Sequence, residues 1–198
     1  MTTVFILSGF ILGENASTIT EFDDFENLLR KKGYEVVRVA IDYDKHTHTT
    51  YIAEFLENYT VLKTEKNIVI GNSFGAVVAL FSAPDFLPSE LYLCSMSPFF
   101  AETLADERFY DYAVQEFGKD RADDLKTYST VEIAYKINQL NIPVHFTYGE
   151  FETGIYDHLV DFNKSYQKSF MNSEIAMIPH APHGMRDPSY YHAIAELL

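Results

Sequence analysis

Residues 71–75, Gly-Asn-Ser-Phe-Gly, contain the residue types of a serine nucleophile on a sharp turn. The apolar, β-branched run at 68–70 precedes this pentapeptide and a small-residue helix pattern follows it, which predicts a strand, a tight turn and a helix. The two glycines would let that strand and helix approach closely. We therefore expect Ser73 at the apex of a nucleophile elbow, with an ordinary glycine-rich turn and a capping serine as the alternative.

The other residues that could do chemistry give weaker signals. His46 and His48 are close in sequence, yet no cysteine or carboxylate accompanies them at a known ligand spacing, so we expect no metal site. The single cysteine, Cys94, lies in an apolar run and is expected to be buried in a strand rather than to act as a nucleophile.

The elements that would position these residues alternate along the chain. Alternating apolar strands and helices predict a three-layer α/β/α sandwich with a mostly parallel sheet of about six strands. Residues 98–141 show only helical fragments between two strands, and we expect a helical lid or cap there. Strands are expected at 4–8, 34–41, 67–70, 91–96, 143–149 and 174–178, and helices at 22–29, 51–59, 76–80, 104–117, 131–140, 155–170 and 188–198.

Composition narrows the classes of partner. A chain of 198 residues with 47% hydrophobic residues suits one domain over residues 1–198. Because 29 acidic residues outnumber 15 basic ones, the net charge of -14 disfavours nucleic acid and anionic membrane surfaces. The first residues lack a signal-peptide pattern, and no apolar run reaches membrane-spanning length. We expect a cytoplasmic protein without a nucleic-acid partner, a membrane partner or a cofactor.

Three segments together resemble the α/β-hydrolase superfamily over nearly the whole chain. They are the pentapeptide at 71–75, Tyr-Gly-Glu-Phe-Glu at 148–152, and His-Ala-Pro-His-Gly-Met at 180–185. Their order, serine, acid and histidine, is the order of that family. The resemblance implies a compact α/β-hydrolase fold whose first strand matches the family's third, without the usual N-terminal antiparallel hairpin. It also implies that the second strand lies at one edge and the first beside the strand of the elbow.

The resemblance implies roles for two further side chains. His183 would be the base that accepts the proton of Ser73, with His180 as the nearby alternative. Glu152 would orient that histidine, although the family more often has aspartate there; Glu150 and Asp157 remain alternatives. The other histidines are expected to be structural or solvated: His46, His48, His145, His158 and His192.

The resemblance also implies an oxyanion hole, a pair of N–H donors for the charge that develops on the substrate's carbonyl oxygen. The backbone N–H groups of Phe74 and Phe10 would be these donors, and Ser8-Gly9 replaces the family's usual His-Gly. Four aromatic side chains could line an apolar acyl pocket or simply belong to the core: Phe10, Phe74, Phe99 and Phe100.

These expectations favour a small serine hydrolase, above all a carboxylic-ester hydrolase that works through an acyl-enzyme on a small-molecule ester or other acyl substrate. Thioesterase, amidase or peptidase activity is the alternative within the fold. A non-catalytic binding protein that retains the fold is the alternative from a different class.

Overall fold

The computed structural model describes residues 1–9, 22–43, 47–152 and 159–198. Within these ranges six strands form one sheet in the order β2-β1-β3-β4-β5-β6, and every neighbouring pair is parallel. This confirms the predicted parallel sheet, with the second strand at an edge and the first beside the strand that leads to Ser73. The strands are β1 Thr2–Leu7, β2 Glu35–Val39, β3 Lys66–Asn72, β4 Glu90–Cys94, β5 Val144–Gly149 and β6 Ser173–Ile178.

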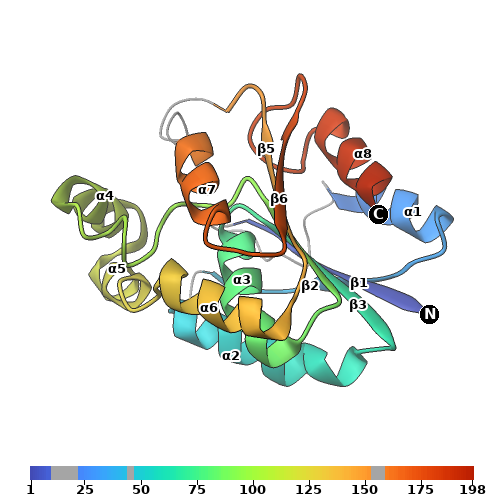
Figure 1. Ribbon diagram of the computed structural model, residues 1–198, viewed down its shortest axis with the longest axis horizontal. Coiled ribbons are helices and arrows are strands. Elements are labelled where there is room, and N and C mark those ends of the chain that lie inside the picture. Colours follow the sequence, from blue (N-terminus) through green and yellow to red (C-terminus); the bar gives the residue numbers. More distant parts are fainter. Residues whose placement is uncertain (10–21, 44–46, 153–158) are drawn as a thin grey trace.

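Helices cover both faces of the sheet, so the predicted three layers are present (Figure 1). α1 and α8 lie on one face, whereas α2, α3, α6 and α7 lie on the other. The helices are α1 Asp23–Lys31, α2 His48–Tyr59, α3 Phe74–Phe86, α4 Glu107–Phe117, α5 Lys119–Leu125, α6 Thr130–Leu140, α7 Leu159–Gln167 and α8 Pro188–Leu197, with a short 3₁₀ helix at Thr60–Leu62.

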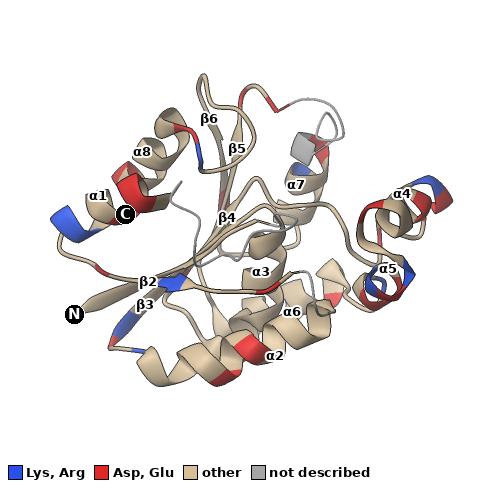
Figure 2. Ribbon diagram, turned by 180° about the vertical axis from the view of Figure 1, so that it is seen from behind, with Lys and Arg blue, Asp and Glu red and all other residues tan. Residues whose placement is uncertain are grey.

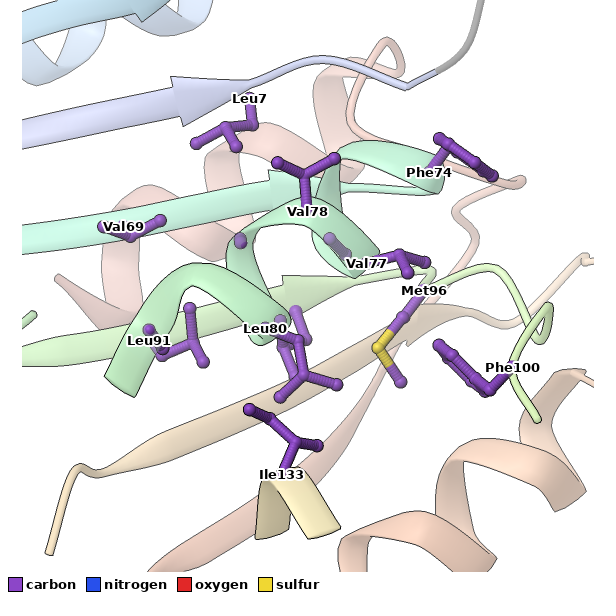
Figure 3. Packing of buried hydrophobic residues seen from close by; sticks show 14 of the residues in the cluster. Leu7, Val69, Phe74, Val77, Val78, Leu80, Leu91, Met96, Phe100 and Ile133 are labelled. Carbon is purple, nitrogen blue, oxygen red and sulfur yellow. The ribbon is translucent and has the colours of Figure 1, made fainter. Parts of the chain in front are cut away.

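The central strands are apolar on both sides because each separates two hydrophobic clusters. In β1, Phe5 and Leu7 point into the cluster with α2, α3 and α6, while Val4 and Ile6 point into the cluster with α1 and α8. Strand residues alternate between faces, so a strand covered on both faces reads as a continuous apolar run. Figure 3 shows the first cluster, in which side chains of β1, β3 and β4 pack against α3 and α6. Ser73 thus follows a strand held rigidly from both sides.

Two details differ from the expectation. The helix expected at 76–80 is longer: α3 contains Pro84 and ends at Phe86, before the left-handed Leu87. α3 is buried nearly all round, and this packing compensates for the backbone hydrogen bond that a proline cannot donate. α5 was not predicted because it is short and buries only Ala122 and Leu125, too few apolar positions for a helical period.

The segment 98–141, predicted as a lid, contains α4, α5 and α6. α6 contributes Ile133 and Ile137 to the core cluster and packs beside α3. α4 and α5 extend away from the sheet and carry acidic and basic side chains side by side (Figure 2). Exposed ion pairs of this kind add little stability. α4 contacts the core through the buried Ala113 and through Phe117, which packs against Phe74 and Phe99.

Candidate active site

Ser73 connects β3 to α3 in a backbone conformation that non-glycine residues seldom adopt. Its φ is 52° and its ψ is -116°. The Ser73 N–H donates to the carbonyl of Cys94 at 2.8 Å, and the Ser73 carbonyl accepts from Ala76 N–H at 3.1 Å. An uncommon φ/ψ pair held by hydrogen bonds costs free energy and is typical of functional sites. The predicted strand, sharp turn and helix are all present around Ser73.

Close backbone approach explains the glycines on either side of this turn. A Cβ on Gly71 would lie 2.4 Å from the Cα of Ala76, and a Cβ on Gly75 would lie 2.3 Å from the carbonyl oxygen of Ser8. Both distances are shorter than non-bonded atoms tolerate. Only glycine therefore fits at residues 71 and 75 as long as β3, α3 and the segment after β1 stay this close together.

The side chains of Ser73, His183 and Glu152 form a continuous hydrogen-bonded series. His183 Nε2 lies 3.2 Å from Ser73 Oγ, and His183 Nδ1 lies 3.0 Å from Glu152 Oε2. The Glu152 side chain is fully buried, whereas that of His183 is 22% exposed. A buried carboxylate on Nδ1 favours the tautomer with hydrogen there, which leaves Nε2 as the acceptor for the serine hydroxyl.

The structure places the alternative histidine and carboxylate elsewhere. The side chain of His180 is 82% exposed, and its Nδ1 lies 3.4 Å from Glu150 Oε2. Glu150 also accepts the His180 backbone N–H at 2.8 Å, so these two residues pair with each other. Asp157, His46 and His158 lie outside the described residues.

The predicted oxyanion donors are described only in part. Phe74 is the first residue of α3, where the helix dipole favours negative charge. Phe10 lies outside the described residues, but Gly9 lies against Ser73: a Cβ on Gly9 would be 3.0 Å from Ser73 Cβ. The chain after β1 therefore passes directly beside Ser73.

Aromatic rings surround Phe74 on the side of α4. The ring centroid of Phe117 lies 5.7 Å from that of Phe74 and 5.1 Å from that of Phe99. Phe99 also stacks on Tyr112 at 6.1 Å. Phe100 is fully buried and belongs to the core cluster, beside Tyr166. Phe74, Phe99 and Phe100 are therefore all buried members of the core cluster, and the first two contact Phe117 of α4.

Sequence reasoning missed two serines next to these residues. Ser95 Oγ lies 2.6 Å from Glu152 Oε1, and Ser97 Oγ lies 3.1 Å from Ser73 Oγ. Both follow β4, the neighbour of β3 in the sheet. Because the carboxyl ends of parallel strands meet at one edge, polar residues directly after the fourth strand were a usable signal.

Burial determines the protonation of two other groups near the site. Cys94 is fully buried, and burial raises the pKa of its thiol to about 12, as expected for a strand cysteine that is not a nucleophile. His48, expected to be structural or solvated, opens α2 and is 1% exposed, with its ring 5.4 Å from that of Phe74. This burial lowers the pKa of His48 to about 3, so its ring is neutral.

The described ranges contain neither a metal-binding cluster nor a membrane-spanning helix. No group of three or more histidine, cysteine or acidic side chains there is arranged to hold a metal ion. Among the same residues, no helix is both long and apolar enough to cross a membrane.

Solved structures with this fold are numerous, although no protein-family model and no curated protein matches the chain. An α/β-hydrolase enzyme from the metagenome of lagoon sediments of Mar Chica, Morocco, aligns with a TM-score of 0.72 at 17% identity, over 99% of this chain and 89% of that one. Est1E from Butyrivibrio proteoclasticus aligns with a TM-score of 0.70 at 15% identity, over 99% and 84%. An esterase from Exiguobacterium antarcticum aligns with a TM-score of 0.68 at 16% identity, over 100% and 90%. The chain therefore adopts the α/β-hydrolase fold.

Proposed function

We propose that this protein is a serine hydrolase that cleaves small-molecule carboxylic esters through an acyl-enzyme on Ser73. The observation that carries the proposal is the series Ser73 Oγ, His183 Nε2, His183 Nδ1 and Glu152 Oε2, with separations of 3.2 and 3.0 Å. Nucleophile, base and orienting acid are then all within hydrogen-bond reach of one another. Esterases among the structural neighbours support the same choice of reaction.

In the acylation step, Ser73 Oγ attacks the carbonyl carbon of the ester while His183 Nε2 accepts the hydroxyl proton. The imidazolium that forms keeps its Nδ1–H on the Glu152 carboxylate, which stabilises the positive charge. Negative charge develops on the carbonyl oxygen of the tetrahedral intermediate. The backbone N–H groups of Phe74 and Phe10 are the proposed donors to that oxygen.

The intermediate collapses when the bond to the ester oxygen breaks. His183 returns its proton to this oxygen, the alcohol leaves, and the acyl group stays on Ser73. Water then attacks the acyl carbon and gives a proton to His183. Release of the carboxylic acid returns that proton to Ser73, so the enzyme is unchanged over one cycle.

The aromatic side chains beside Phe74 favour an apolar acyl group. Phe99 and Phe117 present rings there, and Phe117 belongs to α4 in the proposed lid, residues 98–141. Such surfaces stabilise hydrocarbon chains by excluding water. The net charge of -14 further disfavours strongly anionic substrates such as acyl-coenzyme A.

Hydrolysis of p-nitrophenyl acetate and butyrate, compared with matched thioesters and anilides, tests this function. We expect the ester to be cleaved faster than the anilide, and Ser73→Ala to abolish turnover. Ser82→Ala is the matched control, since Ser82 is a buried serine of α3 whose hydroxyl donates to the carbonyl of Ala79 in the same helix. Turnover that survives Ser73→Ala, or the absence of hydrolysis by the wild type, would contradict the proposal.

A further inference from the structure

Ser95 contacts both the acid and the loop that carries the histidine. It directly follows β4 and is fully buried. Its Oγ lies 2.6 Å from Glu152 Oε1 and accepts the Gly184 N–H at 3.2 Å. Gly184 follows His183 in the chain. The Ser95 hydroxyl therefore contacts both the Glu152 carboxylate, which pairs with the His183 imidazole, and the backbone next to His183.

The number of hydrogens fixes the direction of the bonds around Ser95. Glu152 Oε1 accepts the Gly149 N–H at 2.7 Å as well as a bond from Ser95. A hydroxyl has a single hydrogen, and a carboxylate oxygen at 2.6 Å is the strongest acceptor for it. The Tyr190 hydroxyl oxygen also lies within reach of the Ser95 hydrogen, at 3.0 Å, but this is the longer contact and has the weaker acceptor of the two.

One more hydroxyl joins this buried group. Tyr190 OH lies 3.1 Å from Thr147 Oγ1, and either hydroxyl can be the donor of that bond. Burial raises the pKa of the Tyr190 phenol well above its ordinary value, so the phenol keeps its hydrogen. The buried hydroxyls of Thr147, Tyr190 and Ser95 thus form one connected group, which donates to Glu152 Oε1 through Ser95.

The backbone of Ser95 adds an independent observation. Its φ is 47°, in the left-handed region that a residue other than glycine, asparagine or aspartate seldom adopts. A serine kept there costs free energy that a glycine would avoid. A function for the hydroxyl group explains why a serine occupies this position.

We propose that Ser95 is a positioning residue, which holds the Glu152 carboxylate as a pure acceptor and fixes the adjoining His183 loop. This inference rests on the proposed function of Ser73, His183 and Glu152. With Oε1 occupied by two donors, Oε2 is directed at His183 Nδ1. A glutamate, which has one more rotatable bond than the aspartate usual in the family, needs this additional anchor to act as the orienting acid.

Two substitutions remove successive hydroxyls of the chain. Ser95→Gly removes the first and suits the left-handed backbone, which favours folding; Tyr190→Phe removes the second. We expect Ser95→Gly to slow fluorophosphonate labelling of Ser73 about 10- to 100-fold and Tyr190→Phe to slow it less, in line with lost hydrogen bonds to a charged group. Ser82→Ala, a buried serine outside the network, keeps the wild-type rate.

Two readouts separate positioning from a general effect on structure. In a Glu152→Ala background, Ser95→Gly should slow labelling several-fold less than in the wild type, because the bond to Glu152 is gone and only the bond from Gly184 N–H remains to be lost. The far-downfield proton resonance of His183 Nδ1–H, identified by its loss in His183→Gln, should shift in Ser95→Gly and stay unchanged in Ser82→Ala.

Equal slowing in the wild-type and Glu152→Ala backgrounds, or an unshifted resonance in Ser95→Gly, would overturn the role of Ser95. The His183 Nδ1–H resonance can be recorded whether or not the protein turns over a substrate. A wild type that is not labelled at Ser73 would refute the proposed function alone, and the response of the resonance would still decide whether Ser95 positions Glu152 and His183.

Discussion

The backbone of Gly149 lies directly against that of Pro182, in the loop that carries His183. A Cβ on Gly149 would be 2.2 Å from the carbonyl oxygen of Pro182 and 2.4 Å from that of Ala181. Gly149 also donates its N–H to Glu152 Oε1 at 2.7 Å. The end of β5 therefore sets the separation between the segment of the acid and the segment of the histidine.

Gly149→Ala should displace residues 181–183, because backbone atoms cannot move aside as a flexible side chain can. We expect about 2–4 kcal/mol lower free energy of unfolding and more than tenfold slower ester hydrolysis. Urea unfolding and p-nitrophenyl acetate turnover measure the two effects.

Gly33→Ala is the matched control for Gly149→Ala. Gly33 follows α1 with a φ of 93°, and no heavy atom lies within 4 Å of its would-be Cβ. The control should lose about 1 kcal/mol from backbone strain and keep full turnover. Normal turnover in Gly149→Ala would show that the close approach does not position His183.

Substitutions of the two carboxylates after β5, Glu150 and Glu152, should change turnover to very different extents. Glu152→Gln keeps the shape but replaces one oxygen by an amide nitrogen, which disfavours the Nδ1–H tautomer of His183; we expect turnover to fall by about 10²- to 10⁴-fold. Glu150→Gln, which affects a residue paired with exposed His180, should stay within about twofold of the wild type. Comparison of kcat/KM for the two variants checks the assignment, and a larger loss in Glu150→Gln would reverse it.

The sequence predicted the sheet well because its strands carry strong local patterns. β1, β3 and β4 are short apolar runs between polar or glycine-containing segments, and their order agreed with the family resemblance. The elbow at Ser73 also has a strong local pattern, because close backbone approach requires glycine on either side of it. Local pattern and fold point to the same structure at these positions.

Contacts between distant segments could not be predicted in the same way. Ser95 follows β4, Thr147 lies in β5 and Tyr190 in α8, and no spacing in the sequence indicates that their hydroxyls meet. For His48 the sequence left a structural and a solvated position open, and the rings of Phe74 and Tyr128 pack against it. Such contacts depend on how elements pack, which periodicity does not encode.

Phe117 should limit the length of the acyl group because its ring lies between Phe74 and Phe99. Phe117→Ala should raise turnover of p-nitrophenyl octanoate relative to the acetate by about 10-fold, as a hydrocarbon chain fills the vacated volume. Phe109→Ala is the control on the same helix, since Phe109 packs against Phe162 instead. An unchanged octanoate-to-acetate ratio in Phe117→Ala would place the acyl group elsewhere.

His48 should make the protein less stable as the pH falls. Burial lowers its pKa to about 3 in the folded protein, while the unfolded chain takes up a proton near pH 6.5. The unfolded state therefore binds more protons between these values, and stability falls as the pH drops through 6.5.

His48→Phe keeps an aromatic ring and removes the titration. The wild type should lose about 2 kcal/mol more than this variant between pH 7 and pH 5, measured by urea unfolding. Effects of carboxylates common to both proteins cancel in the comparison. Parallel pH dependence of the two proteins would show that His48 can be protonated in the folded state.

The central claim is that Ser73 is the nucleophile, and covalent labelling tests it most directly. The purified protein is treated with a fluorophosphonate, and peptide mass spectrometry locates the adduct in the wild type, Ser73→Ala and His183→Ala. We predict one adduct on Ser73, none in Ser73→Ala, and labelling slowed by at least about 100-fold in His183→Ala. An adduct on another residue, or labelling that survives Ser73→Ala, would contradict the account.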